Sequence, residues 1–247
     1  MDKGLWISWY NLADAGRDAY LSWLYGTYIP GILGKPGVLW AAHYASTKMP
    51  PLPHIRHTND RSVPTGNDYV LIFGAETAHA FSKGVNAFIK AGPGKLHAEL
   101  SEADKKMLSM RIGERVCITT EEARVDGPGA KSRGGSLTPG PCIQLGSFNV
   151  GSCEVEDELL SWYADWRMSA LSALPGCVGV RKLVSISGWA KHLVLYEFTS
   201  LESRAEHLPT LRNLYPEMLA WTERFIPKLT HAPESPIVAQ RIWPPVK

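Results

Sequence analysis

Residues 22–37 read SWLYGTYIPGILGKPG, and residues 161–176 read SWYADWRMSALSALPG. The two segments align without a gap. They share a serine and a tryptophan near the start and a Pro-Gly pair at the end: Ser22, Trp23, Pro36 and Gly37 in the first, and Ser161, Trp162, Pro175 and Gly176 in the second. A Pro-Gly pair after an apolar helical pattern is typical of a helix end. The sequence therefore predicts that one structural unit occurs twice.

Each helical segment lies between two runs that have the composition of β-strands. GLWISWY at 4–10 and VLWAAHYA at 38–45 flank the first segment, and CIQLGSFNV at 142–150 and VGVRKLVSI at 178–186 flank the second. Short runs rich in aromatic and β-branched residues predict strands. The repeated unit is therefore a strand, a helix and a second strand.

The helix of each unit is predicted from a stripe of apolar residues. The first helix is expected over 15–34, with Asn11 and Asp14 as turn or cap residues and with Pro30 kinking or interrupting it. The second is expected over 156–173, where acidic residues at its start favour the helix dipole. The predicted stripes consist of Leu21, Leu24, Tyr28 and Ile32, and of Leu160, Tyr163, Arg167, Leu171 and Leu174.

Further strands and helices complete both halves. A tight turn at Ser187-Gly188 predicts a hairpin between 178–186 and 191–199. Ser101 and Asp104 resemble a capping box that opens a helix over 102–110. The remaining predictions are strands at 69–74, 115–125 and 236–243, a helix at 76–90, and a helical region over 200–226 that is broken near Pro209 and Pro216. Each half then has the β-α-β-β-α-β order of a ferredoxin-like unit.

A four-stranded sheet with both helices on one face leaves its other face apolar, and a second sheet can cover that face. The sequence therefore predicts an α+β fold of two ferredoxin-like βαββαβ repeats, packed sheet to sheet as an intramolecular α+β barrel. The repeats are expected at 1–125 and 142–247, joined by a Gly/Pro/Ser-rich linker or mobile loop at 126–141. A loop as long as the one predicted at 46–67 is often a lid or binding element.

Composition limits the class of protein. Hydrophobic residues make up 45% of the 247 residues and charged residues 20%, which suits a globular chain with a large core. The formal charge of +2 predicts no binding of nucleic acid or of an anionic membrane. The four cysteines have no C-x-x-C spacing, which predicts reduced thiols. With no secretory pattern and no membrane-spanning run, a cytoplasmic location is expected.

The arrangement resembles the dimeric α+β barrel superfamily in a duplicated, single-chain form, and its EthD-like branch in particular. The resemblance rests on the strand, the helix with its tryptophan and final Pro-Gly, and the next strand, at 4–45 and at 142–186. EthD-like proteins commonly carry a histidine two residues before a proline on the first helix. The matching positions here hold Tyr28 and Arg167, so that role is not carried over. The superfamily includes cofactor-free monooxygenases, lactone isomerases, polyketide cyclases and haem enzymes, and the resemblance therefore implies a fold rather than a reaction.

Four residues are the candidates for catalysis: His43, Tyr28, Arg167 and His79. Strand alternation places His43 between small neighbours on one face, where a cavity could hold a titrating base. Tyr28 and Arg167 occupy equivalent positions on the two apolar stripes, as a proton donor and as an anchor for an anionic substrate. The alternatives are a half-exposed strand histidine, a core tyrosine, and an arginine that pairs with Glu197 or Glu158 or extends into solvent.

The aromatic residues are candidates for the lining of a substrate pocket, with core packing as the alternative. The predicted substrate-binding residues are Trp6, Trp23, Trp40, Trp162 and Trp166. No metal site is predicted, because His54 and His57 lack a suitably spaced carboxylate partner. A haem would need an axial histidine aimed into a pocket, for which His43 or His207 are the candidates, and nothing else in the sequence supports one.

These observations lead to two hypotheses of different kinds. The first is a cofactor-free enzyme of the lyase, isomerase or cyclase type, which transfers a proton on a small hydrophobic molecule, aromatic or polyketide-like. The second is a non-catalytic protein that binds a small molecule or serves in assembly, and a cofactor-free or haem-dependent oxygenase is a further alternative. A homodimer is compatible with either. An open cavity around His43 or Arg167 would favour the enzyme, and a filled core would favour the binding protein.

Overall fold

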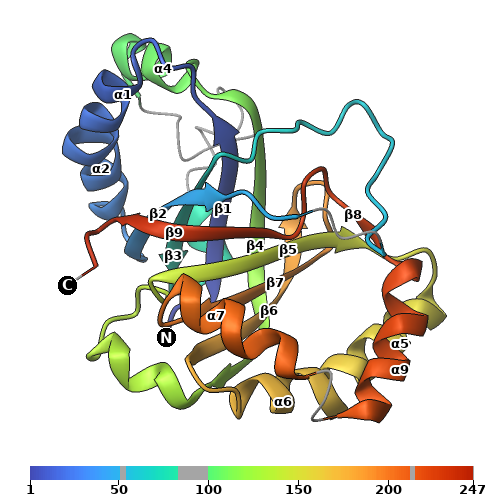
Figure 1. Ribbon diagram of the computed structural model, residues 1–247. Coiled ribbons are helices and arrows are strands. Elements are labelled where there is room, and N and C mark those ends of the chain that lie inside the picture. Colours follow the sequence, from blue (N-terminus) through green and yellow to red (C-terminus); the bar gives the residue numbers. More distant parts are fainter. Residues whose placement is uncertain (51–53, 83–99, 212–214, 247) are drawn as a thin grey trace.

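A closed β-barrel is the centre of the computed structural model, which describes residues 1–50, 54–82, 100–211 and 215–246 (Figure 1). In this part of the chain one antiparallel sheet has the strand order β7-β6-β4-β1-β3-β2-β9-β5-β8, and β7 also pairs with β5, which closes the barrel. The strands are β1 Gly4–Asn11, β2 Val38–Thr47, β3 Tyr69–Ala75, β4 Ile112–Asp126, β5 Cys142–Asn149, β6 Cys177–Ser187, β7 His192–Phe198, β8 Thr230–His231 and β9 Ile237–Trp243.

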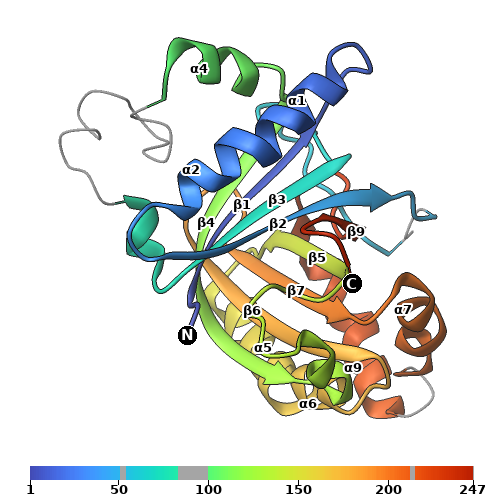
Figure 2. The same ribbon diagram turned by 90° about the vertical axis from the view of Figure 1, so that its left-hand side faces the viewer.

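The helices form two groups on opposite sides of this barrel (Figure 2). One group covers the strands of the first half and the other covers the strands of the second half. The α-helices are α1 Arg17–Trp23, α2 Ile29–Leu33, α4 Glu102–Leu108, α5 Cys153–Ser161, α6 Met168–Ser172, α7 Leu201–His207 and α9 Pro216–Phe225. Shorter helical turns are η1 Leu24–Tyr28, η2 Ala78–Ser82, η4 Pro128–Arg133, η5 Trp162–Arg167, η6 Leu208–Thr210 and η7 Ile226–Lys228.

The two halves of the chain have the same strand order. In each half the fourth strand lies beside the first, then the third, then the second: β4-β1-β3-β2 and β9-β5-β7-β6. This is the ferredoxin-like order predicted from the sequence. The two sheets are joined at both edges, because β4 pairs with β6 and β2 pairs with β9. They therefore form one continuous barrel. The sequence predicted an intramolecular barrel of two packed sheets, but not the edge pairings that close it.

Strand alternation separates three hydrophobic cores. The inside of the barrel holds one set of side chains from every strand except β8, including Trp9, Tyr44 and Leu183. The opposite faces of β1, β2 and β3 pack against the first helix group, and those of β5, β6 and β7 against the second. The position of His43 on the same face as Ala41 confirms the predicted alternation of β2.

Each of the two repeated helices contains a π-helical turn at the corresponding place. The turn η1 ends at Tyr28, and the turn η5 ends at Arg167. Pro30 follows the first turn without interrupting the helix, and the second turn forms without a proline. A π turn adds a residue and shifts the buried face. For this reason Leu159 is buried in the second helix, and the predicted stripe residue Leu160 is exposed.

The predicted element ends are largely confirmed. Ser101 caps α4 by accepting a hydrogen bond from the backbone N–H of Asp104, and Gly37 and Gly176 have positive φ after the repeated helices. The hairpin of β6 and β7 forms as predicted. Asn11 is not a helix cap, because its Oδ1 accepts hydrogen bonds from the backbone N–H groups of Asn67 and Asp68. The predicted helix at 76–90 begins as η2, and its remainder lies outside the described residues.

Two segments without long helices or strands make specific contacts with the barrel. The 46–67 loop reaches the second half, where His57 forms a parallel bridge with His231. The segment 126–141 is held by Glu197, which accepts hydrogen bonds from Arg133 and from the backbone N–H of Gly140. In the residues described, both segments are therefore attached to the barrel by hydrogen bonds.

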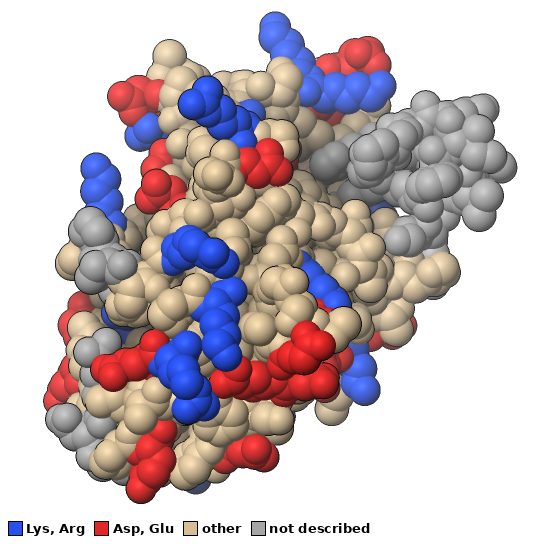
Figure 3. All heavy atoms as spheres, turned by 90° about the vertical axis from the view of Figure 1, so that its right-hand side faces the viewer, with Lys and Arg blue, Asp and Glu red and all other residues tan. Residues whose placement is uncertain are grey.

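The surface drawn in Figure 3 carries charges of both signs. Acidic and basic side chains lie close together over its lower part, so this face has no patch of a single sign. None of the helices in the described ranges is both long enough and apolar enough to cross a membrane.

Candidate functional site

His43 lies in the middle of β2 and points from the barrel toward the first helix group. Its side chain is completely buried, and it belongs to the same face of the sheet as Ala41. The alternative of a half-exposed strand histidine is therefore wrong. The sequence places a polar side chain at this apolar layer, and a buried polar group requires hydrogen-bonding partners.

Two tyrosines supply those partners. The Tyr10 hydroxyl lies 2.8 Å from Nε2 of His43, and the Tyr25 hydroxyl lies 2.8 Å from Nδ1. A neutral imidazole has one N–H donor and one acceptor nitrogen, so one tyrosine donates to the ring and the other accepts from it. The three side chains come from β1, β2 and η1, and they form a continuous hydrogen-bonded row.

The row continues deeper into the protein. Tyr10 and Tyr20 share a hydrogen bond, and Nε of Arg111 donates to the Tyr20 hydroxyl at 2.6 Å. Nη1 of Arg111 donates to Glu114, which neutralises the buried arginine. The guanidinium also lies 4.6 Å from the centre of the Tyr10 ring. We call His43, Tyr10, Tyr25, Tyr20 and Arg111 the tyrosine–histidine cluster.

Burial determines the protonation states in this cluster. Desolvation, together with the positive charge of Arg111, lowers the pKa of His43 to about 3. Burial raises the pKa of Tyr10 and that of Tyr25. At neutral pH the imidazole is therefore uncharged and both phenols are protonated. Such a row can pass a proton from one hydroxyl to the other without placing a charge on the ring.

The cluster reaches the surface through two half-buried tyrosines. Tyr25 stacks on Trp243 at 5.9 Å between ring centres, and Tyr69 stacks on His43 at 5.3 Å. Tyr69 also lines a groove of about 820 Å³ between the end of β2 and the residues just before β9. The groove is lined by Arg17, residues 45–50, Ile55, His57, residues 67–69 and residues 234–237. Its volume is sufficient for a small organic molecule.

The other predicted catalytic residues do not all join this cluster. Tyr28 is buried beside it, with its ring 5.4 Å from the guanidinium carbon of Arg111. His79 is exposed in η2, outside the buried row. Arg167 lies in the helix layer of the other half, so the structure does not bring it together with His43.

Arg167 is half-buried against two aromatic rings. Its Nε donates to the Tyr196 hydroxyl at 3.2 Å, and its guanidinium carbon lies 5.3 Å from that ring and 5.5 Å from the Trp162 ring. Glu197 and Glu158 pair with other cations instead. Among the described residues no carboxylate lies within ion-pair distance of Arg167, so the predicted pairing with either glutamate is wrong.

The five predicted tryptophans are distributed over three layers and do not line one pocket. Trp6 and Trp23 lie in the first helix layer, and Trp40 lies inside the barrel, where its Nε1 donates to Asp2 at 2.8 Å. Trp162 and Trp166 pack in the second helix layer. None of the five lines the groove. Their contacts fit the core-packing alternative.

Sequence reasoning did not select Tyr10, Tyr25 or Arg111. A signal was present for the two tyrosines, because Tyr10 alternates with Trp6 on β1 and Tyr25 lies three residues before Tyr28 on the helix. Arg111 carried no such signal. It reaches the cluster from the turn between α4 and β4, a contact that only the tertiary structure creates.

The described residues give little support for a bound metal or haem. They contain no group of three or more His, Cys, Asp or Glu side chains that could hold a metal ion. Both ring nitrogens of His43 are occupied by tyrosine hydroxyls, so this residue does not fit the role of an axial haem ligand. The space between the second helix group and the sheet is filled by large side chains such as Trp162, Phe198 and Phe225.

Comparison with known proteins identifies the fold. No protein-family model matches the sequence, and no curated protein matches it. Solved structures with the same fold include an anthrone oxidase-like protein, with 10% identity over 98% of this chain and 91% of that one and a TM-score of 0.59. A candidate monooxygenase from Fusobacterium nucleatum has 10% identity over 98% and 93% of the chains and a TM-score of 0.57. A dye-decolorizing protein from V. cholerae has 11% identity over 97% and 94% and a TM-score of 0.51.

The chain therefore has a ferredoxin-like α+β barrel fold, as these structures do. This confirms the fold that the resemblance implies. Membership of the superfamily, the EthD-like branch and the internal gene duplication remain predictions. At these identities the likeness concerns the fold alone and leaves the reaction open.

Proposed function

We propose that this protein is an enzyme that donates a proton to a small hydrophobic, carbonyl-bearing molecule through the Tyr25 hydroxyl. The observation that carries the proposal is the row formed by Tyr25, His43 and Tyr10, in which a buried neutral imidazole joins two phenols at 2.8 Å each. Tyr25 is the half-exposed end of this row. The ligand would lie in the groove, which Tyr69 lines, and would reach the half-exposed Tyr25 hydroxyl past the Tyr69 ring.

The chemistry follows from the protonation states. Tyr25 stays protonated at neutral pH because burial raises its pKa, so it acts as the acid toward a developing enolate oxygen. A carboxylate of the groove, Asp68 or Glu234, takes the carbon-bound proton.

His43 then returns a proton to Tyr25 from Nδ1 and takes one from Tyr10 at Nε2. This transfer leaves the negative charge on Tyr10, beside the Arg111 guanidinium. When the enol returns to the keto form, the row runs in reverse and restores the Tyr10 phenol. Because the imidazole pKa is lowered to about 3, this relay avoids a charged intermediate on the ring. Enolisation of this kind belongs to isomerase, lyase and cyclase reactions.

Cofactor-free oxygenation is a related candidate. An enolate formed at the same place could react with dioxygen, and several solved structures of this fold are described as monooxygenases or as anthrone oxidase-like. Both reactions share the proton step at Tyr25. Measurement of dioxygen uptake distinguishes them.

A non-catalytic binding protein is the second proposal. The complete burial of His43 among closely packed core residues favours it, because no cavity opens directly onto the imidazole in the described residues.

The lack of a carboxylate beside Arg167 supports a separate proposal, in which Arg167 anchors an anionic group in the second half.

Hydrogen–deuterium exchange at an acidic carbon tests the enzyme proposal. Anthrone in deuterated buffer is the first probe, with NMR detection of the methylene protons and a blank without protein. The wild type should accelerate exchange, and Tyr25→Phe should reduce the acceleration at least about tenfold, in line with the usual contribution of a general acid. Tyr215→Phe, at a half-buried tyrosine of the second half, is the matched control and should keep the activity.

Each outcome has a defined meaning. Exchange without dioxygen uptake supports an isomerase or lyase, and exchange with uptake supports the oxygenase. The alternative result is that a panel of aromatic ketones and lactones binds to both the wild type and Tyr25→Phe without any hydrogen–deuterium exchange. That result would contradict the enzyme proposal and support the binding-protein proposal. Equal exchange rates in Tyr25→Phe and the wild type would contradict the role of Tyr25.

A further inference from the structure

A second cavity has no residue of the tyrosine–histidine cluster in its lining. It measures about 630 Å³ and lies between the segment 132–141 and residues 241–246. We call it the C-terminal pocket. Four prolines form apolar, rigid parts of its wall: Pro139, Pro141, Pro244 and Pro245.

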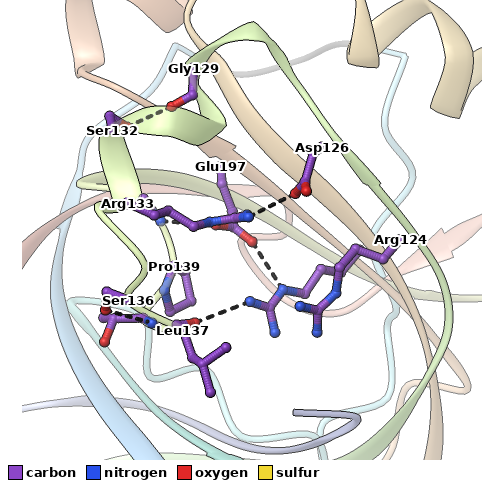
Figure 4. Close-up of polar contacts among 12 residues, drawn as sticks. Arg124, Asp126, Gly129, Ser132, Arg133, Ser136, Leu137, Pro139 and Glu197 are labelled. Carbon is purple, nitrogen blue, oxygen red and sulfur yellow. Dashed lines mark hydrogen bonds and ion pairs between the residues drawn. The ribbon is translucent and has the colours of Figure 1, made fainter. Parts of the chain in front are cut away.

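The lining of the C-terminal pocket is basic. It includes Arg133 and Arg241 and several hydroxyl side chains, and no acidic residue is among the described residues that line it. The positive charge of Arg133 is neutralised by two carboxylates, because its guanidinium pairs with Asp126 at 2.8 Å and with Glu197 at 2.9 Å (Figure 4). Arg241 therefore carries the uncompensated positive charge of the pocket.

Arg241 is positioned but not neutralised. Its Nη1 donates to the Pro139 carbonyl at 2.7 Å, and its backbone N–H donates to the Pro141 carbonyl at 2.8 Å. Its Nε is buried without a hydrogen-bonding partner, and in the described ranges no carboxylate lies within ion-pair distance. A guanidinium whose donors are not all used presents N–H groups to a planar anion.

The opposite wall is held rigidly in place. Glu197, which is completely buried, accepts from Arg133, from the backbone N–H of Gly140 at 3.0 Å and from Arg181 at 3.0 Å. The Tyr44 hydroxyl lies 3.2 Å from the Gly140 carbonyl. Because these contacts already order the wall, a ligand would not lose affinity by ordering it.

We propose that the C-terminal pocket binds a small organic carboxylate with a flat apolar body. The carboxylate accepts hydrogen bonds from Nη2 of Arg241, which has no partner among the described residues and is not buried as Nε is. The apolar body lies against the proline rings and Val246, which explains why a carboxylic acid with a ring suits the pocket better than inorganic phosphate. The lining of this pocket shares no residue with that of the groove, and the proposal does not rest on the proton transfer at Tyr25.

Isothermal titration with benzoate tests the site, with benzamide and inorganic phosphate as comparison probes. The wild type should bind benzoate at least tenfold more tightly than either comparison probe. Arg241→Gln should weaken benzoate binding at least tenfold, and Tyr25→Phe should leave it unchanged. Equal affinity of the wild type and Arg241→Gln for benzoate, or no benzoate binding to the wild type, overturns the proposal. Tighter binding of phosphate than of benzoate also overturns it.

A second pair of variants avoids any loss of folding caused by removal of the Arg241 contact with Pro139. Val246 is 49% exposed and lines the pocket, so substitution there should leave the fold intact. Val246→Glu places a negative charge in the pocket and should weaken benzoate binding, whereas Val246→Gln, which has nearly the same size, should retain it. Equal benzoate affinity in both Val246 variants contradicts the electrostatic part of the proposal.

Discussion

Tyr25 and His43 are joined by a hydrogen bond of 2.8 Å between the phenol oxygen and Nδ1 of the imidazole. The two residues come from different elements, the π-helical turn η1 and strand β2. The same imidazole contacts the Tyr10 hydroxyl through Nε2. A completely buried histidine is thus satisfied by neutral groups alone, which keeps it uncharged at neutral pH and makes it a hydrogen-bonded link between a half-exposed and a buried phenol.

His43→Phe removes both hydrogen bonds while keeping a planar side chain in the layer. It should lower the free energy of unfolding by about 1–3 kcal/mol, because the buried Tyr10 hydroxyl loses a partner. Urea denaturation measures the change. Combining His43→Phe with Tyr10→Phe should recover part of the loss, since removing both partners is less costly than removing one. His79→Gln, at an exposed position, should change stability by less than about 0.5 kcal/mol. A full-sized loss in His79→Gln would contradict this explanation.

The free energy of unfolding should depend on pH because buried histidines are neutral in the folded state. In the folded state burial lowers the pKa of His43 to about 3, and that of His231 to about 4, also by burial. The unfolded chain takes up these protons near pH 6.5. The two neutral histidines therefore contribute fully to the free energy of unfolding above about pH 6.5. As the pH falls toward 4 and then 3, this contribution is lost, by up to about 1.4 kcal/mol per pH unit for each histidine.

Urea denaturation between pH 4 and pH 7 measures this slope. His43→Phe should have a shallower dependence than the wild type in this interval, because the histidine at position 43 no longer contributes to it. Parallel curves for the two proteins would show that His43 is not neutral in the folded state.

Glu197 should be one of the most sensitive positions in the chain. Its buried carboxylate pairs with Arg181 and Arg133, and these two cations lower its pKa although burial acts in the opposite direction. Glu197→Gln leaves the buried Arg181 and the half-buried Arg133 without this charge and should cost about 3–5 kcal/mol. The control is Glu158→Gln, at a more exposed glutamate that pairs with Arg224 and Lys228, where a loss of about 1 kcal/mol or less is expected. Thermal unfolding measures both variants. Equal losses of stability in Glu197→Gln and Glu158→Gln would contradict the assigned burial of the Glu197 carboxylate.

Two glycines of the first repeated helix should respond in opposite directions to alanine. Gly31 lies inside α2, and a Cβ there meets nothing within 4 Å, so Gly31→Ala should stabilise the protein by about 0.5–1 kcal/mol. Gly37 follows the helix with φ of +84°, and Gly37→Ala should destabilise it by about 1–2 kcal/mol. Thermal denaturation of the two variants compares them directly. The same sign of change in both would contradict the assigned backbone geometry.

The repeated segments predicted more of the fold than of the site. The strand and helix order, the Pro-Gly ends and the alternation of β2 depend on neighbouring residues, and all were readable from the sequence. The displaced stripe at Leu159 was not readable, because a π-helical turn changes the helical phase without a distinctive sequence signal. The candidate His43 is completely buried, and its catalytic role remains a prediction. For Arg167 the alternative of a pair with Glu197 or Glu158 is wrong, because its Nε donates to Tyr196, and its role as an anchor for an anionic substrate remains a prediction.

By itself the sequence determined two βαββαβ halves, because periodicity, turn residues and helix ends are local properties of the chain. The tertiary structure alone decided how the sheet edges join, since the pairings of β4 with β6 and of β2 with β9 connect segments far apart in sequence. It also decided which hydroxyls meet His43, and it placed Arg241 opposite the segment held by Glu197. Those contacts depend on barrel closure, which brings together residues that no sequence spacing relates.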